Sequence, residues 1–306
     1  MLDRYILGSV HRISPEAPVP VVHVAQEKSV PGGSANVAWN VVSLGGHASV
    51  AGMVGRDEAG RELSGLLKKR GVSLGSALES TEHPTTVKMR IIADRQQVVR
   101  VDWEDRFKYS DRLLAAFRKH LEGEVAMSGG VILADYGKGV LQQPVVDAVL
   151  RAAAKKKVPV SLDPKDFGLH VDGIAFATPN RKEAFAAAGV PETRPHDDPL
   201  ADEALLDVGK RLLAKWRPQQ LMITLGAHGM LLVYRGRKPV HVPARAREVF
   251  DVSGAGDTVI ATCTLALAAG ASFEEAADLA NWAAGVVVGK LGTATCTPEE
   301  LLNYMD

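Results

Sequence analysis

Short apolar runs alternate with segments of helical spacing through most of this 306-residue chain. Strands need only a few residues, whereas helices need longer stretches with a period near 3.6. Because alternating strands and helices are joined by crossover connections, this order predicts a mainly parallel sheet with helices on both faces. We expect strands at 48–54, 130–134, 158–162, 174–177, 221–225 and 230–234, and helices at 59–70, 111–121, 144–157, 203–216, 254–267 and 274–290.

Two segments interrupt this alternation. Ile6 to Val30 combines three prolines with β-branched residues, and Thr85 to Trp103 alternates polar and apolar side chains. Both patterns favour antiparallel strands outside the main sheet. A β flap would cover the carboxyl edge of the sheet, which is where open α/β sheets bind ligands. We therefore expect one domain over residues 1–306, with a small antiparallel lid formed by about residues 6–30 and 85–103.

The charge balance gives no reason to expect a polyanionic partner. The chain has 36 basic and 36 acidic side chains, so neither nucleic acid nor an anionic membrane is predicted. No apolar run reaches the ~20 residues that span a bilayer, and the N-terminus lacks a signal-peptide core. Cys263 and Cys296 lack the paired spacing of a zinc or redox site. These features predict a cytoplasmic protein.

The most specific motif runs from Asp251 to Thr258 and precedes a long apolar helical stretch. Its glycines, Gly254 and Gly256, let a ligand approach the backbone, and free N–H groups at a helix start attract anions. Asp257 would repel a bound phosphate unless it faced the attacking hydroxyl, a geometry that suits a general base. The alternative is a tight turn whose aspartate merely favours the first helical turn.

A second glycine motif lies near the N-terminus. Gly32 and Gly33 precede a helical stretch that contains Asn36, whose amide can both donate and accept hydrogen bonds as a sugar requires. The alternative is an ordinary glycine turn in which Ser34 caps the helix.

Two further patterns suit a nucleotide site. Asn180 and Glu183 are three residues apart and share a helix face, so an amide and a carboxylate can hold a hydrated Mg²⁺; a solvated helix start is the alternative. Gly226 and Gly229 permit a turn that a ribose or phosphate can approach, or a plain hairpin. The chain has neither a P-loop motif nor an early G-x-G-x-x-G, so neither a P-loop mechanism nor a nucleotide-dependent oxidoreductase is supported.

The two glycine motifs, in this order, resemble the two signature patterns of the ribokinase-like (PfkB) carbohydrate kinase family over essentially the whole chain. The resemblance implies a three-layer αβα fold, ATP as co-substrate, Mg²⁺ as cofactor and scope for a monovalent cation. It implies that Asp257 is the catalytic base, within the turn of Gly254, Ala255 and Gly256. The implied ATP-binding residues are Asn180, Glu183, Thr224, Gly226, Gly229 and Asn281, with Glu183 meeting Mg²⁺ through water.

Within the family, several segments look like the heptose 7-phosphate kinases. They are 1–5, 12–22, 88–90, 100–102, 135–139 and 163–165. This resemblance implies phosphorylation of D-glycero-β-D-manno-heptose 7-phosphate at C1, in ADP-heptose and lipopolysaccharide core synthesis. The implied substrate-binding residues are Asp3, Gly32, Gly33 and Asn36 for the sugar, and Arg12, Arg90, Lys138 and Lys165 as cations available to its phosphate.

Other features depart from the family pattern. Relatives carry a first strand that ends in Gly-Asp ahead of the segment matching Met1–Tyr5, and its loss would leave ladder groups unpaired and weaken folding or activity. Many relatives also carry a fused cytidylyltransferase domain, which we do not expect here.

A homodimer through the lid is expected, because a flap alone is marginally stable. The competing functions are another PfkB-family sugar kinase and a non-catalytic sugar-binding relative.

Overall fold

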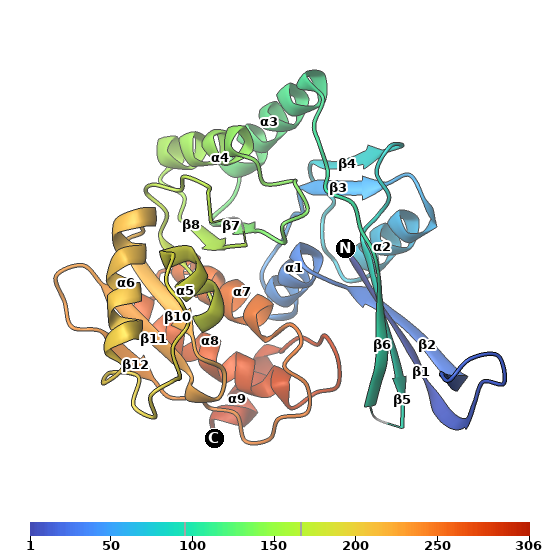
Figure 1. Ribbon diagram of the computed structural model, residues 1–306. Coiled ribbons are helices and arrows are strands. Elements are labelled where there is room, and N and C mark those ends of the chain that lie inside the picture. The colour runs from blue at the N-terminus through green and yellow to red at the C-terminus, as the bar shows by residue number, and fades with distance from the viewer. Residues whose placement is uncertain (95, 166) are drawn as a thin grey trace.

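The fold is described by a computed structural model that covers residues 1–94, 96–165 and 167–306. Its described strands form a central sheet of six strands, a separate sheet of four strands and a two-stranded pair. Figure 1 shows the four-stranded sheet projecting from one side of a body that is covered by helices.

The central sheet is mainly parallel. Its strands are β7 (Val131–Ala134), β8 (Val160–Asp163), β9 (Phe176–Ala177), β10 (Gln220–Thr224), β11 (Met230–Tyr234) and β12 (Val240–Val242). They lie in the order β12-β11-β10-β9-β8-β7. Strands β7 to β10 run parallel, and β11 and β12 add an antiparallel edge. Five of the six expected runs lie in this sheet, and four of them, β7 to β10, form its parallel part as predicted.

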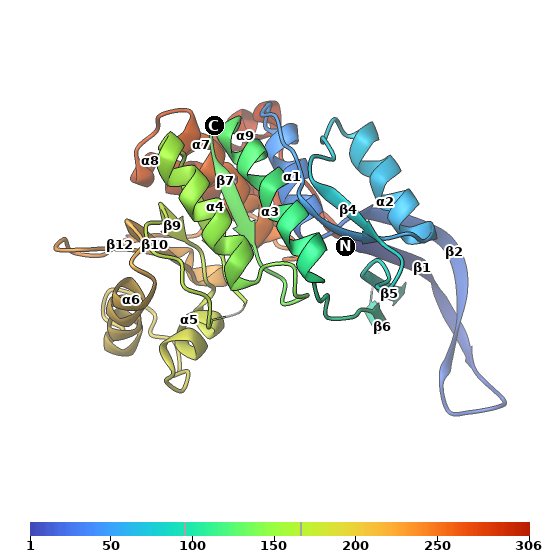
Figure 2. The same ribbon diagram turned by 90° about the horizontal axis from the view of Figure 1, so that it is seen from above.

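Helices cover both faces of this sheet. The helices are α1 (Ser34–Ser43), α2 (Glu58–Lys69), α3 (Asp111–Ala126), α4 (Gln143–Lys156), α5 (Arg181–Ala188), α6 (Glu203–Trp216), α7 (Ala255–Ala268), α8 (Phe273–Val288) and α9 (Pro298–Met305). Leu221 and Ile223 of β10 pack with α3 to α6, whereas Met222 packs with α1, α7 and α8. Successive strand side chains point to opposite faces, so the fold has the predicted three αβα layers. Figure 2 shows α3 and α4 side by side along one face.

One expected strand of the central sheet lies elsewhere. The run at 48–54 forms only β3 (Gly52–Gly55), which pairs in parallel with β4 (Ala77–Ser80) in the two-stranded sheet. The sequence did not indicate β4 because its four residues contain a single long apolar side chain. The predicted placement of this run in the main sheet was therefore wrong.

The lid is the four-stranded sheet, in the order β2-β1-β5-β6. Its strands are β1 (Leu2–Ile13), β2 (Pro20–Pro31), β5 (Val87–Ala93) and β6 (Gln96–Trp103). The pairs β1–β2 and β5–β6 are antiparallel as predicted, whereas β1 and β5 are parallel. Strand β1 begins at Leu2, four residues before the predicted start of the lid at 6, so Asp3 is part of the lid. The expected lid segment 85–103 includes residue 95, which lies outside the described residues.

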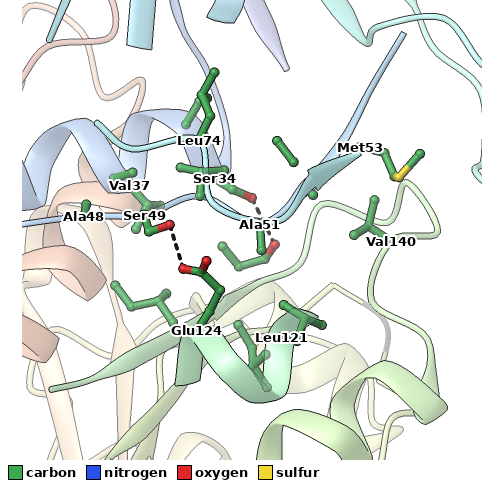
Figure 3. Close-up of a pocket in the computed structure, with 18 of the residues that line it drawn as sticks. Ser34, Val37, Ala48, Ser49, Ala51, Met53, Leu74, Leu121, Glu124 and Val140 are labelled. Carbon is green, nitrogen blue, oxygen red and sulfur yellow. Dashed lines mark hydrogen bonds between the residues drawn. The ribbon is translucent and has the colours of Figure 1, made fainter. Parts of the chain in front are cut away.

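An apolar cavity of about 650 Å³ lies between β7 and the β3–β4 pair. Figure 3 shows its walls, which include Ala51, Leu74 and Leu121. Two hydrogen bonds cross it: Ser49 Oγ donates to Glu124 Oε2 at 3.0 Å, and Ser34 Oγ donates to the Ala134 carbonyl at 3.4 Å. Within the described chain, β8 is the strand that pairs with β7, so the other edge of β7 faces this cavity.

None of the helices in the described ranges is both long and apolar enough to cross a membrane.

Candidate active site

The start of α7 carries the carboxylate that the sequence indicated as catalytic. Gly254 precedes the helix with a φ of 84°, in the left-handed region that glycine adopts without strain. A Cβ at Gly254 would lie 2.9 Å from Asn36 Nδ2. Glycine is therefore favoured at position 254 both by the backbone conformation and by the close approach of α1. Asp257 lies in the first turn of α7, where the helix dipole is positive.

Two donors hold the Asp257 carboxylate. Asn36 Nδ2 donates to Oδ2 at 2.7 Å, and the Tyr136 hydroxyl donates to Oδ1 at 2.5 Å. Burial raises the pKa of Asp257 to about 6, although both hydrogen bonds oppose the rise, and the charge of Asp3 adds to it. A carboxylate with a pKa slightly below neutral is ionised at pH 7 and can accept a proton, as a general base must.

A second buried carboxylate lies beside Asp257. Burial raises the pKa of Asp163 to about 7, and the charge of Asp257 is the next largest cause. Like charges close together disfavour ionisation of both groups. Asp163 therefore retains a proton over part of the neutral range beside the ionised Asp257, and such a shifted pKa is typical of functional sites.

Asp3, expected to hold sugar hydroxyls, is buried in β1 and compensated by Arg90. Arg90 Nη1 donates to Asp3 Oδ1 at 2.9 Å, and Thr293 Oγ1 donates to Oδ2 at 3.4 Å. A Cβ added at Gly32 would overlap Asp3 Oδ2. The glycine pair and Asp3 are thus brought together, while Arg90 is committed to the carboxylate of Asp3.

Helix α1 does not begin with a glycine turn capped by Ser34, which was the alternative interpretation of the second glycine motif. Gly33 itself precedes the helix with a φ of 56°, and no side chain caps it. Ser34 Oγ donates instead to the Ala134 carbonyl. Asn36 is fully buried, and its side-chain amide is directed at Asp257. The two glycine motifs predicted from the sequence therefore meet at one point.

Asn180 and Glu183 form a capping box at the start of α5. Asn180 Oδ1 accepts from the Glu183 N–H at 2.9 Å, and Glu183 Oε2 accepts from the Asn180 N–H at 2.9 Å. Lys165 forms an ion pair with Glu183 Oε1. The pair therefore forms the helix start that was the structural alternative, and the ion pair commits Lys165 to Glu183.

The side-chain oxygens of Asn180 and Glu183 suit contact with a hydrated Mg²⁺ through water, and they leave little scope for direct ligation of the ion. Both oxygens of Glu183 already accept hydrogen bonds, and its side chain is 11% exposed. Among the described residues, no group of three His, Cys, Asp or Glu side chains has metal-binding geometry. Mg²⁺ commonly keeps several waters and binds through substrate phosphates, so Glu183 can meet it through water.

The remaining residues that were expected to bind ATP lie at or near the carboxyl end of β10. Thr224 N–H donates to the Pro179 carbonyl at 3.0 Å, next to Asn180. Gly226 and Gly229 bound a short 3₁₀ turn with φ values of 59° and 82°. The antiparallel pairing of β10 and β11 makes this turn a hairpin as well.

Asn281 lies beside the same region. Its Nδ2 donates to the Pro243 carbonyl at 2.6 Å, and a Cβ added at Gly229 would overlap the Val242 carbonyl. The segment after β12 therefore links Asn281 of α8 to the turn after β10.

The other two candidate cations lie on the lid side. Lys138 forms an ion pair with Glu104. Desolvation lowers the pKa of Lys88, and the charge of Lys138 is the second cause, so the two ammonium groups share a partly dry space. Arg12 lies nine residues beyond Asp3 on β1, about 30 Å along an extended strand. The structure does not bring Arg12 to the site within one chain.

Tyr136 and Asp163 lie within the 135–139 and 163–165 segments that resemble the family, but the sequence alone indicated no role for either. Tyr136 follows β7 and Asp163 is the last residue of β8, so both lie at the carboxyl ends of apolar strands, where ligand-binding residues of open α/β sheets collect. This position at the ends of two strands is the sequence feature that could have identified them as candidate site residues.

The family match defines the chain, by class, as a carbohydrate kinase. Residues 5–300 match the pfkB family carbohydrate kinase pattern, and the chain belongs to that family.

Two similar proteins are both called bifunctional protein HldE. The one from Caulobacter vibrioides is 47% identical over 305 residues, which cover 98% of this chain and 61% of that protein. The one from Pseudomonas aeruginosa PAO1 is 45% identical over 304 residues, with the same coverage of 98% and 61%. This chain thus spans about three fifths of the length of these relatives.

Solved structures share the fold at low sequence identity. Phosphofructokinase-2 from Escherichia coli in complex with potassium superposes with a TM-score of 0.78 at 20% identity, covering 99% of this chain and 95% of that one. Arabidopsis thaliana ribokinase complexed with ribose and ATP gives a TM-score of 0.72 at 21% identity, covering 100% and 96%. The ribokinase-like fold expected from the sequence is confirmed.

Proposed function

We propose that this chain transfers the γ-phosphoryl group of ATP to the C1 hydroxyl of D-glycero-β-D-manno-heptose 7-phosphate, giving heptose 1,7-bisphosphate. The observation that carries the proposal is Asp257, which lies at the start of α7 and is hydrogen-bonded to Asn36 of the sugar-side motif. The N-terminal segment and the Asp135–Gly139 segment, which look like heptose 7-phosphate kinases, support the choice of sugar. The product would enter ADP-heptose and lipopolysaccharide core synthesis.

The proposed chemistry uses Asp257 as the general base. Its carboxylate accepts the proton of the C1 hydroxyl while the hydroxyl oxygen bonds to the γ-phosphorus and the bond to the β,γ-bridging oxygen breaks. N–H groups in the first turn of α7 and the helix dipole stabilise the charge on the transferred group. ADP then leaves with the electron pair of the broken bond.

ATP is proposed to lie along the carboxyl edge of the central sheet. Thr224 and the 226–229 turn would contact its ribose and phosphates, and Asn281 would lie beside the adenine. Mg²⁺, when bound, neutralises the phosphate charge, and Asn180 and Glu183 would hold its waters. A monovalent cation near the phosphates is part of the same proposal.

The sugar 7-phosphate is proposed to meet Lys138. Arg90 and Lys165 are committed to Asp3 and Glu183. Lys138 is also ion-paired, but its partner Glu104 is more exposed than Asp3 or Glu183. Lys138 lies with Lys88 in a partly dry space, where desolvation and then repulsion by the charge of Lys138 lower the pKa of Lys88. A phosphate dianion would relieve that repulsion through charge-assisted hydrogen bonds.

The proposed enzyme is a cytoplasmic homodimer joined through the lid. The lid exposes several apolar side chains, namely Val24, Val98, Val99, Val101 and Trp103, which are 36% to 53% exposed. Pairing of two lids would cover them and stabilise a flap that is otherwise marginal. Sedimentation equilibrium tests this part, because a monomer at all concentrations would contradict it.

The function is tested by ADP release with Mg²⁺ and a panel of sugars and sugar phosphates, comparing the parent chain with Asp257→Asn. A matched control is Asp207→Asn, since Asp207 is exposed on α6. We expect selective turnover with the heptose 7-phosphate, its loss in Asp257→Asn and its retention in the control. Preference for another sugar would overturn the substrate, and absence of turnover with every sugar would favour a non-catalytic sugar-binding protein.

A further inference from the structure

The loop after β7 brings the Tyr136 phenol against the Asp257 carboxylate. Tyr136 Oη donates to Oδ1 at 2.5 Å, while Asn36 Nδ2 donates to Oδ2 at 2.7 Å. Hydrogen bonds to an ionised carboxylate are shorter and stronger than neutral ones. Each oxygen has one fixed donor, so the orientation of the carboxylate plane is set from two sides.

The loop that carries Tyr136 is itself fixed. Asp135 N–H donates to the Asp163 carbonyl at 3.0 Å, and Gly137 N–H donates to Asp135 Oδ1 at 2.8 Å. On the opposite side, a Cβ added at Gly33 would lie 3.3 Å from the Tyr136 ring. Packing and hydrogen bonds therefore hold the phenol where it is.

Titratable groups reach Asp257 from several elements. Asp3 comes from β1, Asp163 and Lys165 come from the end of β8, and Tyr136 follows β7. Burial, followed by the charge of Asp257, raises the pKa of Tyr136 well above its usual value. The phenol thus stays protonated, and remains a donor, over the whole range in which Asp257 titrates.

We propose that Tyr136 is a positioning residue that keeps Asp257 ionised and oriented for proton abstraction, an inference that rests on the proposed kinase function. Burial alone favours the protonated carboxyl, and the acidic neighbours add to that preference. The phenol opposes it by donating to the charged form. A lone pair on each oxygen remains available to the sugar hydroxyl, because each carboxylate oxygen can accept more than one hydrogen bond.

The deciding variant is Tyr136→Phe, and Tyr109→Phe is its matched control. The Tyr109 hydroxyl donates to the Val140 carbonyl at 3.0 Å, so the control also loses one partly buried phenolic hydrogen bond. The measurement is a ¹³C NMR titration of the Asp257 carboxyl carbon in the free protein, assigned with Asp257→Asn. We expect the pKa of Asp257 to rise by about one pH unit in Tyr136→Phe and to stay unchanged in Tyr109→Phe.

Activity supplies a second readout that a purely structural role would not produce. In Tyr136→Phe the acidic limb of the kcat/KM profile should move upward by the same amount, with activity recovering above it. An Asp257 pKa that is the same in Tyr136→Phe and the parent would overturn the proposal. An acidic limb that does not move in Tyr136→Phe, whatever the loss of activity, would also overturn it.

Two safeguards keep the test decisive. The NMR titration needs no turnover, so it judges Tyr136 even if no sugar is phosphorylated and the proposed function fails. If Tyr136→Phe does not fold, the parent chain can be labelled throughout with 3,5-difluorotyrosine, whose more acidic phenol is a stronger donor. The pKa of Asp257 should then fall, and an unchanged value would overturn the proposal.

Discussion

Arg90 of β5 donates to Asp3 of β1 at 2.9 Å, with the two side chains 16% and 8% exposed. Removing one partner of a buried ion pair leaves an uncompensated charge and typically costs about 3–5 kcal/mol. We therefore expect Arg90→Met to lower the free energy of unfolding by about 3 kcal/mol. Urea unfolding measures the loss.

A double-mutant cycle isolates this pair. Asp3→Asn should restore much of the stability lost in Arg90→Met, because the charge left unpaired is then gone. Strictly additive effects of the two substitutions would show that the ion pair contributes nothing.

Gly32 lies so close to Asp3 that a Cβ would overlap the carboxylate. Gly32→Ala should displace Asp3, raise the KM for the sugar about tenfold or more and leave the KM for ATP nearly unchanged. The control is Gly65→Ala in α2, where a Cβ meets nothing within 4 Å. That control should gain up to about 1 kcal/mol of stability from helix propensity. Equal effects on both KM values would contradict the placement of Gly32 on the sugar side.

The raised pKa of Asp257 determines the direction in which the free energy of unfolding changes with pH. The ordinary value is 3.8 and the folded value is about 6, so the folded state binds the proton more tightly. The resulting stabilisation is complete below pH 3.8 and is lost as the pH rises through 6. The free energy of unfolding of Asp257→Asn, relative to the parent, should therefore increase by roughly 2–3 kcal/mol between pH 4 and pH 7. A difference that does not vary with pH would contradict the raised pKa.

Lys138 is predicted to bind the phosphate that the sugar already carries. Lys138→Ala should raise the KM for the heptose 7-phosphate by at least about tenfold, through loss of a charge-assisted contact. Turnover at saturation should change little. Lys210→Ala, on the exposed surface of α6, is the control and should behave as the parent. A raised KM for ATP, with the KM for the sugar unchanged, would instead place Lys138 at the nucleotide.

Local patterns in the sequence predicted the layers of the fold and the glycine turn that carries Asp257. Gly254 and Asp257 are recognisable because a glycine before an apolar helix has a local physical meaning. The register of the lid and the position of β3 depended on pairing with segments far along the chain, and β4 carries no apolar pattern of its own.

The roles of charged side chains were harder to predict. Lys165 and Arg90 appeared as free cations, but their carboxylate partners are brought to them by tertiary structure. Tyr136 shows the same limitation, since its partner lies 121 residues away. A residue type in a motif indicates what it can do, and its neighbours in space determine what it does.

The most direct test of the central claim is ³¹P NMR of the product formed from ATP, Mg²⁺ and D-glycero-β-D-manno-heptose 7-phosphate. The account predicts a new resonance coupled to the anomeric proton, appearing in step with ADP while the 7-phosphate signal is retained, and no new resonance with Asp257→Asn. A phosphate ester on any other hydroxyl, or the same product from Asp257→Asn at the parent rate, would contradict the account.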